Sequence, residues 1–254
     1  MSEFKGLALP HLSASTINSF IEYRHQFFAS KVEKLPFVTN VNMARGKAVE
    51  HGINVMLNGR DEQTAQTGAL NVWQKEIKGI GLDPRTVEFQ ATLAEGVRTG
   101  GEYYRKVDER APTQQQKIEI TLDGCKLPII GYLDYLYNEF VRDCKITGKT
   151  PSKLRQSYII QGAIYKKAMD LPVWFDFGIP LKGGWKWKPI PLTDEEYEFG
   201  LSYAIAAAKN IEALQNSIDP SEVMELCLAF PNLDAIWDDK EKDRQCERYG
   251  IKRV

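Results

Sequence analysis

Hydrophobic residues recur with two different periods along the chain, and the change of period divides it into two parts. In the first part, up to about residue 110, apolar positions lie three or four residues apart, which is the spacing of a helix with one buried face. Helices are therefore predicted at 14–30, 42–57, 61–80 and 86–106. Ser13 or Ser15 can cap the first of these helices.

From Gln116 onward the period shortens to two residues, as in a strand with one buried face. Asp123-Gly124 favours a hairpin turn, and Thr150-Pro151-Ser152 is a helix start in which Thr150 or Ser152 is the cap. Strands are predicted at 116–122, 125–137, 139–146, 173–181 and 185–188, and helices after residue 152 and at 194–216. This order of elements predicts an α+β fold.

Length and composition indicate a globular protein of ordinary character. The chain has 254 residues, of which 43% are hydrophobic and 26% charged. We expect one domain over 1–254, with a mainly helical part at 13–110, a core at 116–192, and a C-terminal helix and tail at 193–254. The net charge of −1 means that a nucleic-acid partner would have to be held by a local patch.

The four cysteines, Cys125, Cys144, Cys227 and Cys246, form no Cys-x-x-Cys pair. Zinc-finger spacing is therefore absent, and a secreted disulfide framework is not expected in a chain of this size. No stretch approaches the ~20 apolar residues of a membrane span, and the first residues lack an apolar signal core. We expect a cytoplasmic protein with no membrane partner.

Candidate chemistry gathers where the third strand is predicted. Residues two apart on a strand point to the same face, so Asp143 and Lys145 project together. Asp134 lies on the neighbouring strand, within reach if the two strands pair in ordinary register. Together with the backbone carbonyl of Cys144, these oxygens suit a hard cation, Mg²⁺ or Mn²⁺. The alternative is an ion-pair cluster on the surface of a sheet.

The helix after this strand adds two polar residues. Gln161 and Tyr165 are four apart and share one face, from which they could reach a phosphate or a metal-bound water.

These residues resemble the motifs of the RecB-type branch of the PD-(D/E)XK nuclease superfamily. The shared pattern is an Asp in a GxxD context (Asp134), a DxK (Asp143 and Lys145), and a QxxxY helix (Gln161 and Tyr165). The resemblance covers roughly residues 11–200. It implies a restriction-endonuclease-like core, a central mixed sheet flanked by helices, with a helical N-terminal elaboration.

The resemblance also implies roles for single residues. Asp134, Asp143 and the Cys144 carbonyl would bind the metal, and His51, in the slot of the family's upstream histidine, would complete the metal shell or its surroundings. Lys145 would orient or deprotonate the attacking water, or stabilise the charged phosphorane. Gln161 and Tyr165 would hold the helix against the metal strand and touch a phosphate.

Iron–sulfur members of this branch carry one Cys in the first helix and three more in the C-terminal tail. Residues 22–26 of this chain contain no Cys, and the tail has only Cys227 and Cys246. No iron–sulfur cluster is therefore expected.

Residues 185–188 alternate Trp and Lys, so Trp185 and Trp187 could stack on bases while Lys186 contacts a phosphate. The alternative is a tryptophan pair packed on the sheet with the lysines outward. Three further cations are candidates for nucleic-acid contacts: Arg45, Lys47 and Lys149.

The expected activity is that of a metal-dependent DNA exonuclease acting on linear ends in recombination, repair or phage DNA processing. A homo-oligomer or a recombination-protein partner is compatible with it. The alternative is a nucleic-acid-binding or complex-assembly protein that keeps the fold with little catalysis.

Overall fold

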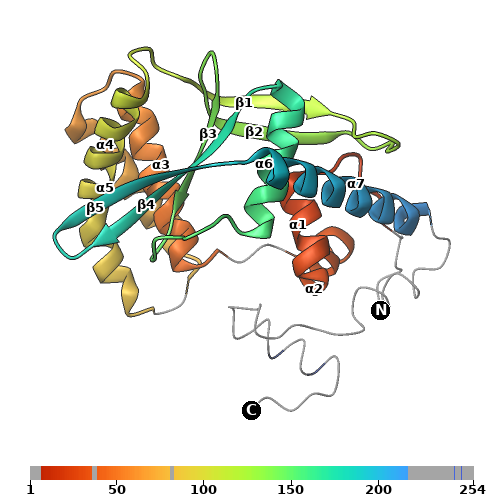
Figure 1. Cartoon of the computed structure of the whole chain (residues 1–254). Helices are drawn as coiled ribbons and strands as arrows, with labels where there is room; N and C mark the ends of the chain where they lie inside the picture. Colours follow the sequence, from red (N-terminus) through yellow and green to blue (C-terminus); the bar gives the residue numbers. More distant parts are fainter. Residues whose placement is uncertain (1–6, 36–38, 81–82, 217–242, 244–246, 248–254) are drawn as a thin grey trace.

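A mixed sheet of five strands forms the centre of the computed structural model, which describes residues 7–35, 39–80, 83–216, 243 and 247 (Figure 1). The strands lie in the order β1-β2-β3-β4-β5, and seven α-helices flank them in the described part of the chain. The strands are β1 (Thr113–Ile120), β2 (Ile129–Leu136), β3 (Val141–Ile146), β4 (Val173–Leu181) and β5 (Gly184–Pro191). The predicted α+β class is confirmed.

One parallel pair makes this sheet mixed. β3 and β4 run parallel, whereas β1–β2, β2–β3 and β4–β5 are antiparallel neighbours. A parallel pair needs a long crossover, and α6 (Gln156–Met169) supplies it. This connection brings the helix of Gln161 and Tyr165 directly after the strand of Asp143 and Lys145.

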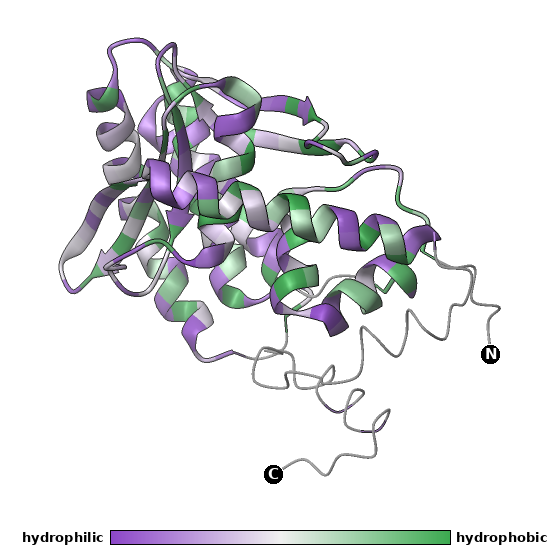
Figure 2. Cartoon of the chain, turned by 45° about the vertical axis from the view of Figure 1, so that its right-hand side comes forward, coloured by the Kyte–Doolittle hydropathy of each residue, from purple (hydrophilic) through white to green (hydrophobic). Residues whose placement is uncertain are grey.

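Helices cover both faces of the sheet (Figure 1). On one face α3 (Val41–Leu57) and α5 (Arg85–Val107) contact the sheet, and α4 (Glu62–Ile77) packs on both of these helices. On the other face lie α6, α1 (Ala14–Glu22) and α7 (Asp194–Asn216). Hydrophobic and hydrophilic residues are interspersed along these helices (Figure 2).

Local capping explains why most predicted helices begin where expected. The Asn40 side chain accepts a hydrogen bond from the Met43 N–H at 3.0 Å at the start of α3. At α7 the Thr193 hydroxyl accepts from the Glu196 N–H at 3.1 Å, and the Glu196 carboxylate accepts from the Thr193 N–H at 3.0 Å. Such reciprocal bonds satisfy donors that a helix start would otherwise leave free.

The predicted helix at 14–30 is interrupted. It consists of α1, α2 (Arg24–Phe27) and a π-helical segment, η1 (Phe28–Val32), with a break at Tyr23, where φ is −141° and ψ is 62°. The break brings the Phe20 and Phe27 rings edge to face at 5.2 Å. In a straight helix two residues seven apart would be about 10 Å apart.

The start of α6 also differs from the prediction. Neither Thr150 nor Ser152 caps the helix, which begins at Gln156 with Arg155 as an N-cap that makes no side-chain capping bond. The preceding loop is held instead by β5, because the Lys188 ammonium donates to the Pro151 carbonyl at 2.8 Å.

Close packing of α6 against α7 depends on Gly200. A Cβ at this position would lie 2.7 Å from the Ile159 carbonyl oxygen and 2.9 Å from the Ala163 Cβ. Since one of these neighbours is backbone, the helices would have to move apart to admit a methyl group.

We predict that Gly200→Ala lowers the free energy of unfolding by about 1–3 kcal/mol, although alanine is the better helix former. Urea unfolding measures this change. The matched control is Gly46→Ala in α3, where a new Cβ would have its nearest neighbour, the Ile146 Cβ, at 4.0 Å. This control should be neutral or stabilising by up to about 1 kcal/mol. Equal effects of the two substitutions would contradict the packing argument.

Candidate active site

A buried ion pair lies in β3. The Asp143 carboxylate is only 1% exposed, and it pairs with the ammonium of Lys145, whose side chain is 21% exposed. Both side chains leave β3 on the same face, as strand alternation predicts. This face carries α6, because Val141, two residues before Asp143, packs in the core beneath that helix.

Asp134 is held next to this pair by a backbone donor. Its carboxylate accepts a hydrogen bond from the Cys144 N–H at 2.9 Å. The antiparallel register pairs Tyr135 with Arg142, so the next opposed pair would be Asp134 with Asp143. The Asp134 carboxylate thus accepts the Cys144 N–H in place of a backbone carbonyl of β2. The expected reach of Asp134 across the two strands is present.

Gln161 and Tyr165 connect α6 to the same strands. The Gln161 amide donates to the Asp143 carboxylate at 3.0 Å and to the Tyr165 hydroxyl at 2.8 Å. The Tyr165 hydroxyl in turn donates to the Tyr132 carbonyl at 3.0 Å. This chain of hydrogen bonds fixes the orientation of Asp143 and ties the helix to β2 and β3.

Glu50 of α3, rather than His51, faces the carboxylates. The pKa of Glu50 is raised from 4.5 to about 7, chiefly by burial and also by the nearby Asp143 charge, against the opposing effect of Lys145. His51 is exposed and lies against α4, where a Cβ at Gly68 would be 3.1 Å from its Nε2. Consecutive helix residues point about 100° apart, so only one of the two can face the sheet. The prediction that placed His51 beside the carboxylates is corrected.

Gln115 is a further polar residue at this place. Its amide donates to the Glu50 carboxylate at 3.2 Å, and it lies where the β1–β2 register skips Asp134, between the pairs Gln114–Tyr135 and Gln116–Leu133. Its backbone is left-handed, with φ of 53°, which is rare for a residue other than glycine. Nothing in the sequence around Gln115 indicates its contact with Glu50, because a run of three glutamines fits an ordinary exposed strand.

The alternation of β2 also shifts at Asp134. Leu133 packs in the core beneath α6, whereas Tyr135, two residues on, packs in the core beneath α3. In a regular strand these two residues would share a face. The irregularity places Asp134 at the boundary between the two faces, between Glu50 of α3 and Asp143.

This cluster contains more acidic side chains than basic ones. Burial raises the pKa of Asp134 well above its ordinary value, and the charges of Asp143 and Glu50 raise it further. Burial also raises the pKa of Asp143, in opposition to Lys145. For Lys145, burial acts to lower the pKa, but Asp143 and Asp134 outweigh it and the pKa is raised. Three carboxylates therefore share one ammonium.

The donor set fits a hard divalent cation in charge and in chemistry. Carboxylate oxygens are the ligands that Mg²⁺ and Mn²⁺ prefer. Within the described ranges, however, no three His, Cys, Asp or Glu side chains stand close enough together to hold a metal ion. Asp143 is engaged by Lys145, and Asp134 by the Cys144 N–H. The metal-ligand roles of Asp134, Asp143 and the Cys144 carbonyl stay predictions.

Both tryptophans of β5 are packed against α5 and are not free to stack on bases. The Trp185 indole donates to the Thr92 carbonyl at 3.1 Å, and that of Trp187 donates to the Thr99 hydroxyl at 3.2 Å. Lys186 between them is exposed. The structure thus has the packed arrangement, and the predicted stacking role of Trp185 and Trp187 is corrected.

The other predicted nucleic-acid contacts differ in availability. Arg45 is 3% exposed and its guanidinium lies over the Phe89 ring at 3.8 Å, so it packs α3 on α5 and cannot reach a ligand. Lys47 is paired with Glu76 at 2.6 Å. Lys149 is exposed in the loop after β3.

Comparison with known proteins identifies the fold but not a family. No protein-family model matches the chain, and no curated protein sequence matches it. Among solved structures, a proposed exonuclease from Eubacterium rectale is 16% identical, with a TM-score of 0.59 and coverage of 82% of each chain. A second structure, SSO0001, is 14% identical over 89% of this chain and 93% of its own, but its TM-score of 0.35 supports no argument. The chain therefore has a nuclease-like fold.

Two other expectations concern the tail cysteines and a membrane span. Cys227 and Cys246 lie outside the described residues. Among the helices that the structure does describe, none has the length and apolar character needed to cross a membrane.

We predict that Glu50→Gln changes the pH dependence of stability. A carboxyl group whose pKa is raised in the folded state stabilises the fold below its unfolded pKa, and this contribution is lost as the pH rises through its folded pKa, here about 7. Between about pH 4.5 and pH 8 the free energy of unfolding of the wild type should fall by about 1–2 kcal/mol relative to that of the variant. This value allows for the partial exposure of Glu50.

Urea unfolding in EDTA, which removes bound divalent ions, measures this difference. The control is Glu198→Gln on the exposed surface of α7, which should follow the wild type at every pH. A Glu50→Gln curve parallel to that of the wild type would show that the pKa of Glu50 is not raised in the folded protein.

Proposed function

We propose that this protein is a divalent-metal-dependent DNA nuclease, and that it acts as an exonuclease on linear DNA. The observation that carries the proposal is the continuous polar connection from Asp134 through β3 to Asp143, Lys145 and Gln161, at the centre of a nuclease-like fold. The proposed exonuclease from Eubacterium rectale, which shares the fold, supports it. Such an activity would serve recombination, repair or phage DNA processing in the cytoplasm.

Hydrolysis of a phosphodiester requires a deprotonated water, neutralisation of the phosphate charge and stabilisation of the leaving oxygen. Asp134 and Asp143, together with the Cys144 carbonyl, would hold Mg²⁺ or Mn²⁺, which lowers the pKa of a bound water and neutralises phosphate charge. The excess of carboxylates over ammonium at this place supports such a role, because their mutual repulsion is relieved by a cation.

Lys145 would act as a charged donor. The neighbouring carboxylates keep its amine protonated, since they raise its pKa despite its burial. A protonated amine cannot accept the proton of a water molecule, but it can donate to a phosphate oxygen and stabilise the charge that develops there. This favours the phosphorane-stabilising role among those that the sequence left open.

Gln161 and Tyr165 would act by positioning. Gln161 fixes one oxygen of Asp143 and leaves the other to Lys145. Tyr165 fixes Gln161 and ties it to the carbonyl of Tyr132. Holding reacting groups in place in this way raises the rate of hydrolysis, because a displacement of about 1 Å takes the carboxylate out of the reactive geometry.

We predict that Asp143→Asn and Lys145→Ala each lower the rate of DNA cleavage by about 10²–10⁴-fold, because each removes a charge from the reacting centre. The measurement is release of labelled nucleotides from linear DNA in Mg²⁺ and in Mn²⁺. Asp123→Asn is the control, since Asp123 is exposed in the β1–β2 turn and should retain wild-type activity.

Full activity in either Asp143→Asn or Lys145→Ala would refute the assignment of the site. EDTA should abolish cleavage by the wild type, and added Mg²⁺ or Mn²⁺ should restore it. Binding of DNA that persists in EDTA, with no cleavage in either metal, would instead favour a nucleic-acid-binding or complex-assembly protein.

We predict that linear DNA is degraded progressively from its ends while covalently closed circular DNA of the same sequence survives. End-labelled linear substrate should release its label as short products before the average length falls. Cutting of the circle at a similar rate would identify an endonuclease and overturn the exonuclease part of the proposal alone.

A further inference from the structure

A pocket of about 390 Å³ lies in the loop that joins β3 to α6. Its lining combines the loop 147–153 with Arg155, Tyr158 and, from β4, Phe177. Three of the lining residues are cationic: Lys149, Lys153 and Arg155. None of the lining residues is acidic, so the pocket suits an anion.

This pocket is adjacent to the candidate active site. The Tyr158 ring lines it, and the Lys145 ammonium lies 5.5 Å from the centre of that ring. Phe177, on the opposite wall, is the register partner of Lys145 in the parallel β3–β4 pair. A strand of nucleic acid with one phosphate at Lys145 would therefore have a neighbouring phosphate at the pocket.

The three cations are available to a ligand. Lys149, Lys153 and Arg155 are exposed, and in the described part of the chain none of them forms an ion pair. No carboxylate among the described residues therefore neutralises their charges.

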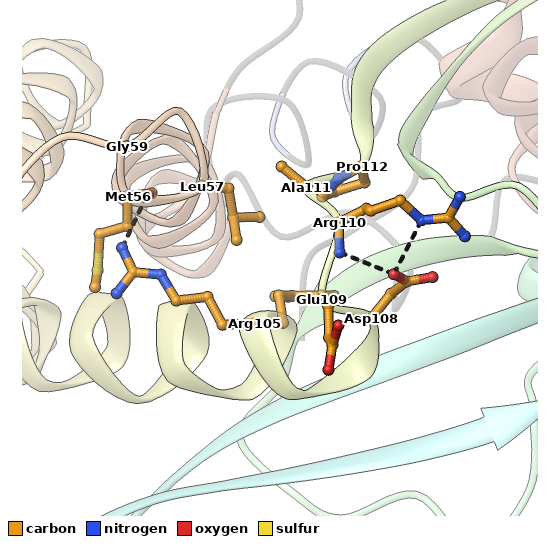
Figure 3. A pocket seen from close by; sticks show the side chains of 10 residues that line it. Met56, Leu57, Gly59, Arg105, Asp108, Glu109, Arg110, Ala111 and Pro112 are labelled. Carbon is orange, nitrogen blue, oxygen red and sulfur yellow. Dashed lines mark hydrogen bonds and ion pairs between the residues drawn. The ribbon is translucent and has the colours of Figure 1, made fainter.

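A second pocket, of about 360 Å³, shows the contrast (Figure 3). There Arg105 donates to the Met56 carbonyl at 3.0 Å, and Asp108 accepts from the Arg110 N–H at 2.9 Å and pairs with its guanidinium. The arginines of that pocket already have partners within the protein, and it also contains the acidic Asp108 and Glu109. It offers no comparable site for an anion.

The frame of the first pocket is fixed at two points. The Lys188 ammonium donates to the Pro151 carbonyl at 2.8 Å, and the Thr147 hydroxyl donates to the Lys149 carbonyl at 2.7 Å. Lys188 also adds a fourth positive charge beneath the loop. No side chain caps α6, and the positive end of its helix dipole lies at Arg155.

We propose that this pocket binds backbone phosphates of the nucleic-acid strand that enters or leaves the candidate active site. The proposal rests on the proposed function, because it takes DNA as the ligand. It assigns Lys153 and Arg155, with Lys149, as residues that hold the strand next to Lys145. The phosphate bound there is either an internal diester or the terminal phosphate of a cut strand.

The test compares Lys153→Ala/Arg155→Ala with the charge-matched control Lys126→Ala/Lys209→Ala, whose residues are exposed near the β1–β2 turn and on α7. Fluorescence anisotropy measures the affinity of each protein for a labelled partial duplex with a single-stranded tail, in EDTA so that no cleavage occurs. The pocket variant should bind about 10-fold more weakly. Its plot of log affinity against log salt should be shallower by about 1–2 units, since two phosphate contacts are lost.

The control variant should keep the wild-type affinity and salt dependence. Lys153→Arg/Arg155→Lys, which keeps both charges, should restore most of the binding. Equal affinities and equal salt slopes for the pocket variant and the control variant would overturn the proposal, as would absence of DNA binding by the wild type at low salt.

The end of the DNA distinguishes the two sources of phosphate. Substrates that carry a 5′-phosphate, a 3′-phosphate or only hydroxyl ends are compared in the same assay. A preference for one phosphorylated end that vanishes in the pocket variant identifies a terminal phosphate, and an equal loss for all three identifies an internal diester. Wild-type binding without cleavage in any metal would refute the proposed nuclease activity while the pocket assignment is judged on binding alone.

Discussion

The buried pair of Asp143 and Lys145 is the constraint to which the surrounding structure responds. A carboxylate that is almost fully buried requires a partner and hydrogen bonds, because an isolated charge in such a place is very costly. Lys145 provides the opposite charge and Gln161 the hydrogen bond, and Tyr165 holds Gln161 in place. The crossover helix α6 therefore stabilises the charged strand as well as connecting two parallel strands. Two further carboxyl groups, Asp134 and Glu50, lie nearby, and burial together with the neighbouring carboxylate charges raises the pKa of each.

Irregular backbone at the neighbouring strands allows these groups to meet. A regular β2 would place successive side chains on alternate faces, whereas the shift at Asp134 lets this carboxylate bond the Cys144 N–H at the edge of the β2–β3 ladder. The left-handed Gln115 lies where the β1–β2 register skips Asp134, and its amide donates to Glu50. Strain of this kind costs about 1–3 kcal/mol per residue and is commonly retained at functional positions. The distortion and the charge cluster thus lie at the same place in the fold.

Much of the site follows from sequence periods, and the remainder depends on packing. The period of two placed Asp143 beside Lys145, and the spacing of four placed Gln161 beside Tyr165. The choice between Glu50 and His51 could not be made in this way, since it depends on the rotation of α3 about its axis, which its packing against the sheet and α5 decides. Residue type was equally uninformative about exposure for Arg45 and Trp187, because long amphipathic side chains cover apolar surface as readily as they contact ligands.

The distribution of free cations follows from the same packing. The β5 tryptophans and Arg45 are used to join α5 and α3 to the sheet, so the regular elements of that face have no basic residue of the predicted set left except Lys186 and the paired Lys47. The exposed cations of the loop after β3 have no such packing role, and this loop starts two residues beyond Lys145. The candidate active site on β3 and the proposed phosphate site in the loop that follows are therefore positioned by the same stretch of backbone.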